Sequence, residues 1–469
     1  MTTKIVKRVV TKKLPAKPKR PASTPGPAPA LRAGGANGAP AGIRVRMYRV
    51  GFGDFFLLTV RGADGTPLHV LIDCGVHAAN LNSIGAAIDQ LAKDTGGRLA
   101  LVIMTHRHAD HISGFGTGKD AFSKFTVERV WMSWFENPKS PAAAKFQATL
   151  TALAANLQLT LAARSDPRDA EYIAMANNIT GDMSATGAAG AGGGNAAALA
   201  TLHGGFANKA PVDYYQAGDT PALPDSLIKA GLTAQILGPP IDPQLVAQMD
   251  GKGHQYLAAN ADDGTPPNRF HRVFRTDAKA YPAEAFELFG VDEIQRRVAA
   301  VQPDLLAAKA AQADNTINNQ SLVVLFGFGG KTMLFSGDAQ WGNWENFLFG
   351  GALGSAGHTA LSSASKTILG KIDFYKVGHH GSTNATPIDA LNAMRDGCVA
   401  MCSTQPGAYG STANNSEVPR VPLLAALDKK TNHQIARSDQ VAVPGAPPIA
   451  DPLPNVFTKS TAGYIDYEM

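Results

Sequence analysis

The strongest constraint on this chain is a histidine-rich turn that directly follows a short apolar run. The run LALVIMT (Leu99 to Thr105) has the length and composition of a central strand that is buried on both faces. It continues into the sequence HRHADH, which begins at His106. Alternation along an extended chain directs His106 and His108 to one side, and Asp110 and His111 follow at a bend. We therefore expect four potential metal ligands to gather at the end of this strand.

The available side chains limit the kind of ion that this turn binds. The chain has three cysteines, Cys74, Cys398 and Cys402, and no CxxC pair, so the sequence indicates neither a disulfide framework nor a thiolate zinc site. Imidazole and carboxylate ligands suit zinc, and also manganese or iron. We expect one or two zinc ions, with manganese or iron as the alternatives.

Three more motifs accompany this turn in a recognisable order. Asp73 lies in LIDCG, Asp338 lies in LFSGD, and His379 and His380 lie in KVGHHGS. Together with HxHxDH, these motifs resemble those of the metallo-β-lactamase-fold hydrolases. The additional segments VGFGDFF and NNQS look most like the ComEC-like branch, the hydrolase domains related to competence DNA-uptake proteins. The resemblance covers about residues 43–118 and 314–442.

The resemblance implies a fold and a set of site residues. The fold is α/β, a four-layer αββα sandwich with a large insertion. Asp73 orients the metal site, and Asp338 bridges two ions. Either histidine of KVGHHGS matches the final motif, and we expect His379 to be the ligand. The implied metal ligands are His106, His108, Asp110, His111, Asp338 and His379. The catalytic candidates are Asp110, His380 and Ser382, the last two as contacts to a substrate oxygen or the leaving group.

One family position is not matched by a histidine. Members of the family usually supply another histidine between the HxHxDH and SGD motifs, but the corresponding segment here reads ADNTINNQS. Asn315, Asn319 or Ser321 is expected to occupy that space. The first metal shell is therefore predicted to be weak or completed by water, and a binding module with an incomplete metal site stays an alternative.

Composition divides the chain into regions. Residues 1–42 are predicted to be a disordered basic tail, because they are rich in Pro and Ala and cannot bury enough apolar surface to fold. Residues 43–449 form the expected hydrolase domain. Its insertion covers about residues 119–313 and contains a flexible Gly/Ala-rich loop at 184–205. Residues 450–469 are expected to be a C-terminal tail.

The uneven distribution of charge bears on partners and location. Nine of the 43 Lys and Arg residues lie in residues 1–42, which hold no Asp or Glu, so the remaining 34 cations face 38 anions. Nucleic acid is thus a possible partner through the basic tail, by sequence-independent attraction. No segment is apolar enough to span a bilayer and none reads as a secretory signal, so we expect no membrane insertion and a cytoplasmic location.

The motifs together predict a metal-dependent hydrolase, a phosphodiesterase or nuclease-like enzyme that uses a metal-bound hydroxide. Its expected substrate is a phosphodiester or another small hydrolysable molecule. Hydrolysis of a lactone, thioester or amide on the same fold is the alternative chemistry. The non-catalytic binding module is the alternative of a different class.

Overall fold

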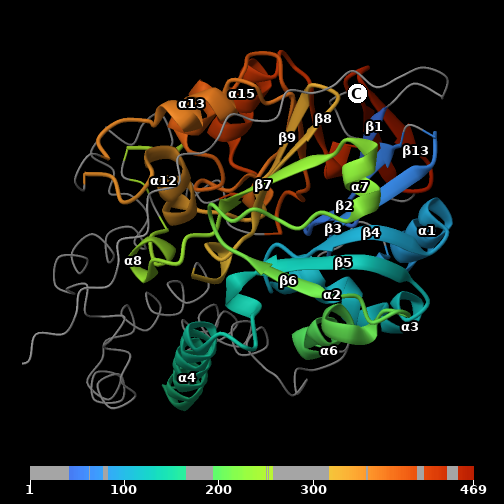
Figure 1. Cartoon of the computed structure of the whole chain (residues 1–469). Helices are drawn as coiled ribbons and strands as arrows, with labels where there is room; N and C mark the ends of the chain where they lie inside the picture. Colours follow the sequence, from blue (N-terminus) through green and yellow to red (C-terminus); the bar gives the residue numbers. More distant parts are fainter. Residues whose placement is uncertain are drawn as a thin grey trace, which may run out of the picture. The chain divides into compact units, whose positions relative to one another are not determined.

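The computed structural model is organised around two β-sheets (Figure 1). All described residues belong to the compact unit 36–469. Mixed sheets with helices on their outer faces place the protein in the α/β class, as the sequence predicts. The residues that the structure describes are 42–62, 64–77, 83–164, 194–249, 251, 253–256, 316–354, 358–408, 417–440 and 453–469.

The first sheet combines antiparallel and parallel strands. Within the described residues its spatial order is β13 (Phe457–Ser460), β14 (Tyr464–Glu468), β1 (Ile43–Tyr48), β2 (Phe55–Arg61), β3 (Pro67–Cys74), β4 (Arg98–Ile103), β5 (Thr126–Ser133) and β6 (Val212–Tyr215). The pairings from β13 to β3 are antiparallel, with Val45 opposite Leu58 in the β1–β2 pair. The pairings from β3 to β6 are parallel. Parallel strands end at one edge of a sheet, so the turns that follow β3 and β4 lie together.

The second sheet repeats this succession. Its spatial order, again within the described residues, is β12 (Ile435–Arg437), β11 (Val399–Cys402), β10 (Phe374–Lys376), β9 (Lys331–Phe335), β8 (Val323–Phe328) and β7 (Thr233–Gly238). β7, β8 and β9 pair antiparallel, and β9 to β12 pair parallel. The β8–β9 hairpin turns at Gly329 and Gly330, as its Gly-Gly sequence predicts.

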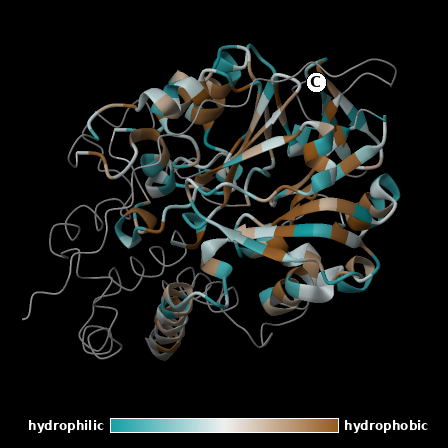
Figure 2. Cartoon of the chain, in the orientation of Figure 1, coloured by the Kyte–Doolittle hydropathy of each residue, from teal (hydrophilic) through white to brown (hydrophobic). Residues whose placement is uncertain are grey.

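The inner faces of the two sheets share one apolar core. Along β2, Phe56 and Leu58 point into this core, whereas Phe55 and Leu57 point to the opposite face of the sheet. The rings of Phe56 and Phe335 lie 6.3 Å apart across the two sheets. Figure 2 shows apolar residues concentrated along the strands. Burial of this surface holds the turns at the ends of both sheets in fixed positions.

Helices cover the outer faces. On the first sheet, α1 (Ile84–Thr95) begins where the Ser83 hydroxyl accepts the N–H of Ala86, ends at a left-handed Gly96, and buries Ile88 and Leu91. The same core includes residues of α2 (Ala109–Thr117), α3 (Lys119–Phe122) and α6 (Gly194–Ala200). The outer core of the second sheet includes residues of α12 (Trp341–Phe349), α13 (Ser363–Leu369), α14 (Ile388–Ala393) and α15 (Val421–Lys430). The remaining described helices are α4 (Pro141–Arg164), α7 (Asp225–Ala230) and α8 (Pro243–Val246).

The segment expected to be an insertion contributes strands to both sheets. β5 and β6 extend the first sheet, and β7 forms an edge of the second. The described residues of the segment 119–313 therefore include strands of the two main sheets and do not form a separate insertion. The second half of the Gly/Ala-rich segment 184–205 also differs from the predicted loop, because it forms α6 and the helical turn η3 (Thr201–Gly205), and residues 184–193 lie outside the described residues. Asn195 of α6 donates a hydrogen bond to the Arg107 carbonyl, which anchors this helix to the histidine-rich turn.

The predicted C-terminal tail is also part of the fold where it is described. β14 pairs with β1 along its whole length, and β13 pairs with β14. A buried network stabilises this edge, because the Arg46 guanidinium donates to both carboxylate oxygens of Asp466 and to Asp94. Residues 1–41 of the predicted basic tail lie outside the described residues. In the part of the chain that is described, no helix is long and apolar enough to cross a membrane.

Candidate metal centre

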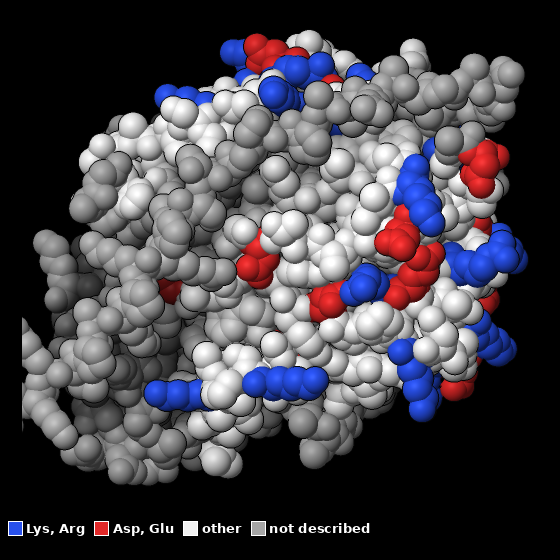
Figure 3. Space-filling view, viewed as in Figure 1, with Lys and Arg blue, Asp and Glu red and all other residues white. Residues whose placement is uncertain are grey.

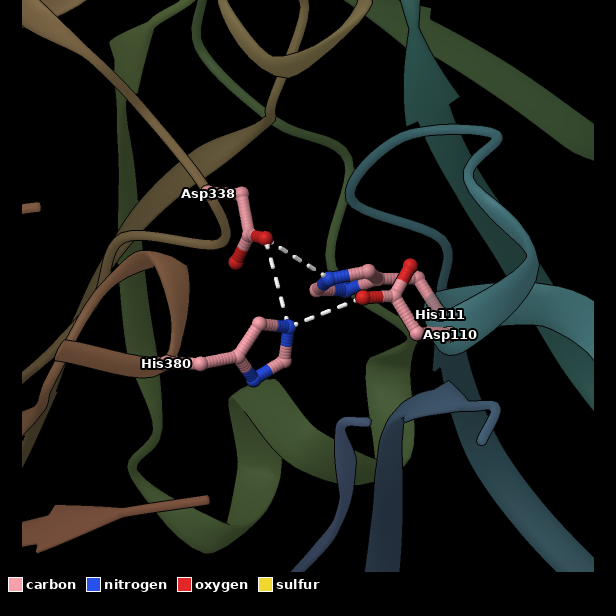
Figure 4. A group of neighbouring side chains, drawn as sticks. All are labelled: Asp110, His111, Asp338 and His380. Carbon is pink, nitrogen blue, oxygen red and sulfur yellow. Dashed lines mark hydrogen bonds and ion pairs between the residues drawn. The ribbon is translucent and has the colours of Figure 1, made fainter. Parts of the chain in front are cut away.

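Turns from the two sheets bring four potential ligands together (Figure 4). Asp110 and His111 begin α2 directly after the β4 turn, Asp338 follows β9, and His380 follows β10. One ligand atom from each of these residues lies within 4.8 Å of the other three. Residues more than two hundred positions apart thus meet at the shared edge of the sheets. We call these four residues the ligand group.

The distances within the ligand group are close to those of ligands around a common ion. Asp338 Oδ2 lies 3.1 Å from His111 Nε2 and 3.4 Å from His380 Nε2. His380 Nε2 lies 3.0 Å from Asp110 Oδ2. His111, Asp338 and His380 are buried, whereas the Asp110 side chain keeps 15% of its surface exposed. Two imidazole nitrogens and two carboxylate oxygens fit the ligand preferences of zinc, manganese and iron.

Hydrogen bonds orient both histidines of the group. The Nδ1 of His380 lies 2.8 Å from the carbonyl oxygen of Ser403, which can only accept, so Nδ1 carries the proton and Nε2 faces the group. The Nδ1 of His111 lies 2.8 Å from Asp73 Oδ2. Asp73 in turn accepts hydrogen bonds from the N–H and the hydroxyl of Thr105, at 2.8 and 2.6 Å. Asp73 therefore fixes the orientation of the His111 imidazole, and a carboxylate in this position also makes the imidazole a stronger base.

The electrostatics of the group favour a cation. Burial by itself lowers the pKa of His111, but the carboxylates of Asp338, Asp73 and Asp110 outweigh it, and the pKa lies well above its usual range. Burial likewise opposes protonation of His380, and Asp338 together with the hydrogen bond to Asp110 raises its pKa. Burial raises the pKa of Asp338, yet His111 and His380 hold it well below its usual range. Positive charge, from protons or from a metal ion, is thus stabilised here.

Close backbone packing holds the first turn against β3. A Cβ atom placed on Gly75 would lie 2.3 Å from the backbone nitrogen of His111. Glycine is therefore required for α2 to approach the end of β3 at this distance.

Asp73, His379 and His380 have positive φ angles of 55°, 42° and 51°. Left-handed backbone is costly for these residue types, and such strain is typical of functional sites.

His106 and His108 lie beside the ligand group rather than in it. The Nε2 of His106 lies 3.1 Å from the Nδ1 of His108, and the rings of His106 and His111 are 4.1 Å apart. Burial, and then the positive charges of His111 and His108, hold the pKa of His106 well below its usual range. The structure thus places the two predicted ligands next to each other and next to the group. Neither is among the residues whose ligand atoms lie within 4.8 Å of Asp338, Asp110 and His380.

The two histidines of the KVGHHGS motif have roles that differ from the prediction. His380 is in the ligand group, whereas His379, the expected ligand, is not among its members. The Nδ1 of His379 lies 2.7 Å from Ser382 Oγ and 3.0 Å from Asn384 Oδ1. Both histidines have left-handed backbone, so their side chains do not alternate as they would along a continued strand. Ser382, predicted to be catalytic together with His380, contacts His379 instead.

Ser321 and Asn319, two of the residues expected in the segment without a histidine, both contact the turn that carries Asp338. Ser321 lies two residues before β8 and is fully buried, and its hydroxyl accepts the backbone N–H of Asp338 at 2.9 Å. The same hydroxyl lies 3.2 Å from the Nδ1 of His106. Asn319 supports the turn after β9, because its side-chain oxygen accepts the N–H groups of Gln340 and Asn343. Asn315 lies outside the described residues.

Two site residues were not predicted from the sequence. Lys376, at the end of β10, is 2% exposed and forms an ion pair with Asp54, which is 1% exposed. Burial lowers the pKa of Lys376, but Asp54 and Asp338 outweigh it and the pKa is raised. Burial raises the pKa of Asp54, and Lys376 opposes this effect. The available signal was a lysine inside the apolar run IDFYKV, since a charge in a central strand requires a buried partner.

Comparisons with other proteins add no independent assignment. No protein-family model matches the chain, and no curated protein matches it at a significant level.

Proposed function

We propose that the protein is a metal-dependent hydrolase with a metallo-β-lactamase-like fold that cleaves phosphodiesters. The observation that supports this proposal most strongly is the meeting of Asp110, His111, Asp338 and His380 from turns of both sheets. Two carboxylates packed in one buried place are costly unless positive charge balances them, and here that charge comes either from protons on the two imidazoles or from a bound cation. A divalent ion, which we propose to be zinc, offsets this cost. When bound, such an ion lowers the pKa of water to about 7 and supplies a nucleophile at neutral pH.

The residues of the centre have separable tasks in this proposal. His111 and His380 present their Nε2 atoms, and Asp338 and Asp110 present carboxylate oxygens. Asp110 is the most exposed of the four, so its carboxylate faces the side from which substrate enters and is placed to accept a proton from the attacking water. His379 and Ser382, in contact with each other at 2.7 Å, lie next to the group. They are the candidates for holding a substrate oxygen or for protonating the leaving group.

Surface charge favours a small phosphodiester over a long nucleic acid as substrate. Outside residues 1–42 the chain has more acidic than basic residues. On the face of the molecule drawn in Figure 3, the Lys and Arg side chains are interspersed with Asp and Glu side chains. Proteins that follow a nucleic-acid backbone usually carry clustered cations instead. In this proposal the basic N-terminal residues supply any attraction for nucleic acid.

The test begins with metal content and continues with substrates. Protein purified without a histidine tag is analysed for metals, then stripped with a chelator and reloaded with Zn²⁺, Mn²⁺ or Fe²⁺. Each form is assayed with bis(p-nitrophenyl) phosphate, nicked DNA and a lactone. We expect metal-dependent hydrolysis of the phosphodiester. Turnover of the lactone alone would indicate the alternative chemistry, and a protein that neither binds metal nor turns over any of the three would contradict the hydrolase proposal.

A further inference from the structure

A buried lysine adjoins the ligand group and carries a charge that the proposed chemistry does not use. The Nζ atom of Lys376 forms an ion pair with Asp54, donates to the carbonyl oxygen of Gly337 at 3.2 Å and lies 3.7 Å from Asp338 Oδ1. The side chain of Lys376 is 2% exposed. An ammonium group in such a place is stable only because carboxylates and a carbonyl surround it. Its position next to Asp338 therefore requires an explanation.

The two carboxylate oxygens of Asp338 face different partners. Oδ2 faces the Nε2 atoms of His111 and His380, at 3.1 and 3.4 Å. Oδ1 accepts the backbone N–H of His379 at 3.0 Å and lies 3.7 Å from the ammonium of Lys376. Asp338 is thus shared between the ligand group and a protein cation. Centres with two metals share a carboxylate in a similar way, with the ions about 3.5–4 Å apart.

A second set of ligand-type atoms lies next to the first, but protein groups already bind it. Oxygens of Asp54 and Asp73 and a nitrogen of His111 lie within 4.8 Å of one another. Asp54 is paired with Lys376. Asp73 accepts hydrogen bonds from the N–H and hydroxyl of Thr105 and lies 2.8 Å from His111 Nδ1. The positive charge that these carboxylates require comes from the protein.

The pair formed by His106 and His108 does not offer a complete second site either. The hydroxyl of Ser321 contacts the Nδ1 of His106, whereas the Nε2 of His106 is the atom that faces His108. The hydroxyl therefore contacts the His106 nitrogen that points away from His108, so it cannot bind the same ion as the two nitrogens that face each other. This pair includes no carboxylate of its own, so it binds a divalent ion more weakly than the ligand group, which has two imidazoles and two carboxylates.

We propose that Lys376 supplies the second positive charge of the centre in place of a second metal ion, so that the protein holds one divalent ion, in the ligand group. This inference rests on the proposed function, because it assumes that the ligand group binds metal. Lys376 is then a positioning residue. It neutralises Asp54 and faces Oδ1 of Asp338, which leaves Oδ2 as the oxygen that would hold an ion.

Metal stoichiometry tests the proposal without an activity assay. Untagged apo-protein is saturated with Zn²⁺, freed of loosely held ions by gel filtration, and analysed by elemental analysis and native mass spectrometry. We expect one zinc ion per chain. Two tightly held ions would overturn the inference and leave the hydrolase proposal standing. A zinc content of zero would overturn the proposed function and the inference with it.

Variants of the ion pair test the role of Lys376 itself. In Lys376→Met the carboxylate of Asp54 loses its counter-ion, so we expect the zinc content to rise from one to two per chain. A folded Lys376→Met protein that still binds one ion would overturn the assigned role. In the double variant Lys376→Met with Asp54→Asn no buried charge is left unpaired, and we expect one ion. Because it removes both charges, the double variant keeps the proposal testable if the single variant does not fold. Two zinc ions in the double variant would mean that a second ion binds without the Asp54 carboxylate, which would contradict the proposal.

Discussion

The two sheets of the molecule follow the same plan but make unequal contributions to the site. In chain order, each begins with three antiparallel strands and continues with parallel ones, β1 to β6 in the first sheet and β7 to β12 in the second. Each has an aspartate at or after the end of its third strand, Asp73 and Asp338. Each has a histidine turn after its fourth strand, at His106–His111 and at His379–His380. Corresponding turns of the two sheets therefore meet at one edge.

The difference lies in what the two aspartates contact. Asp73 is saturated by Thr105 and by the Nδ1 of His111, so its carboxylate orients a ligand. Asp338 directs Oδ2 at the Nε2 atoms of His111 and His380 and is placed as a ligand. The order of strands fixes where each aspartate lies, whereas the neighbouring side chains determine which of them is free to bind an ion.

The largest effect is expected from Asp338→Asn. This change removes the carboxylate charge that faces both imidazoles, and we expect zinc affinity and turnover to fall by more than about 100-fold, beyond the range seen when only an outer partner of a ligand is lost. Zinc titration and the bis(p-nitrophenyl) phosphate assay measure the two quantities. Asp396→Asn is the matched control, because the Asp396 side chain is 84% exposed and pairs only at the surface with Lys430. Normal zinc affinity in Asp338→Asn would mean that the second sheet contributes no carboxylate ligand.

Asp73→Asn, the corresponding change in the first sheet, should have a smaller effect. The amide keeps the shape of the side chain but removes the charge that orients His111, so we expect zinc affinity to fall by about 10–100-fold. At saturating Zn²⁺ the metal content should return to that of the unchanged protein. A loss as large as that of Asp338→Asn, with no recovery at saturation, would remove the distinction between the two aspartates.

The sequence predicts the parts of this centre that local pattern determines. An apolar strand followed by HRHADH places Asp110 and His111 at a strand end, and SGD after a hairpin places Asp338 at another. Within each sheet, parallel pairing brings the ends of neighbouring strands to one edge, whereas the meeting of the two edges depends on the packing of the two sheets against each other. The structure places His380 rather than His379 in the ligand group, and this arrangement depends on positive φ angles, which neighbouring residues impose and which no local pattern of histidines reveals.

Long-range pairing explains the other differences. The ion pair between Lys376 and Asp54 joins residues more than three hundred positions apart, so neither residue alone indicates the other. The final strands β13 and β14 are short and half-polar, and they become strands because β14 pairs with the edge of β1 and β13 pairs with β14. α6 forms in a Gly/Ala-rich segment because it packs against α2 and bonds to Arg107. Tertiary contacts override weak local preference in each case.

Acid should weaken metal binding through the histidines that the two sheets contribute. In the metal-free protein the pKa values of His111 and His380 are raised, so both imidazoles carry protons at pH values where free histidine has begun to lose them. A metal ion needs the neutral Nε2 atoms, so binding releases protons and affinity falls as pH falls, by about tenfold per pH unit for each proton released. Isothermal titration calorimetry with Zn²⁺ between pH 6 and 8, in two buffers of different protonation enthalpy, measures the proton release. An affinity independent of pH, with no proton release, would mean that these histidines are not ligands.

Ser321→Ala is expected to have the smallest effect on zinc binding. The variant also tests whether the Ser321 hydroxyl is a metal ligand at the position where members of the metallo-β-lactamase-fold family have a histidine. The hydroxyl accepts the N–H of Asp338 and contacts the Nδ1 of His106, so its removal leaves a buried N–H unpaired. We expect the free energy of unfolding to fall by about 1–3 kcal/mol, measured by urea denaturation of the apo-protein. Zinc stoichiometry should be unchanged, because the hydroxyl positions the aspartate and does not itself face the ligand group. Ser226→Ala, at a solvent-accessible serine bonded to Glu128, should change neither quantity. Loss of the zinc ion in Ser321→Ala, with the stability unaffected, would make Ser321 a direct ligand. Its hydroxyl would then take the place of the histidine that is absent between the HxHxDH and SGD motifs.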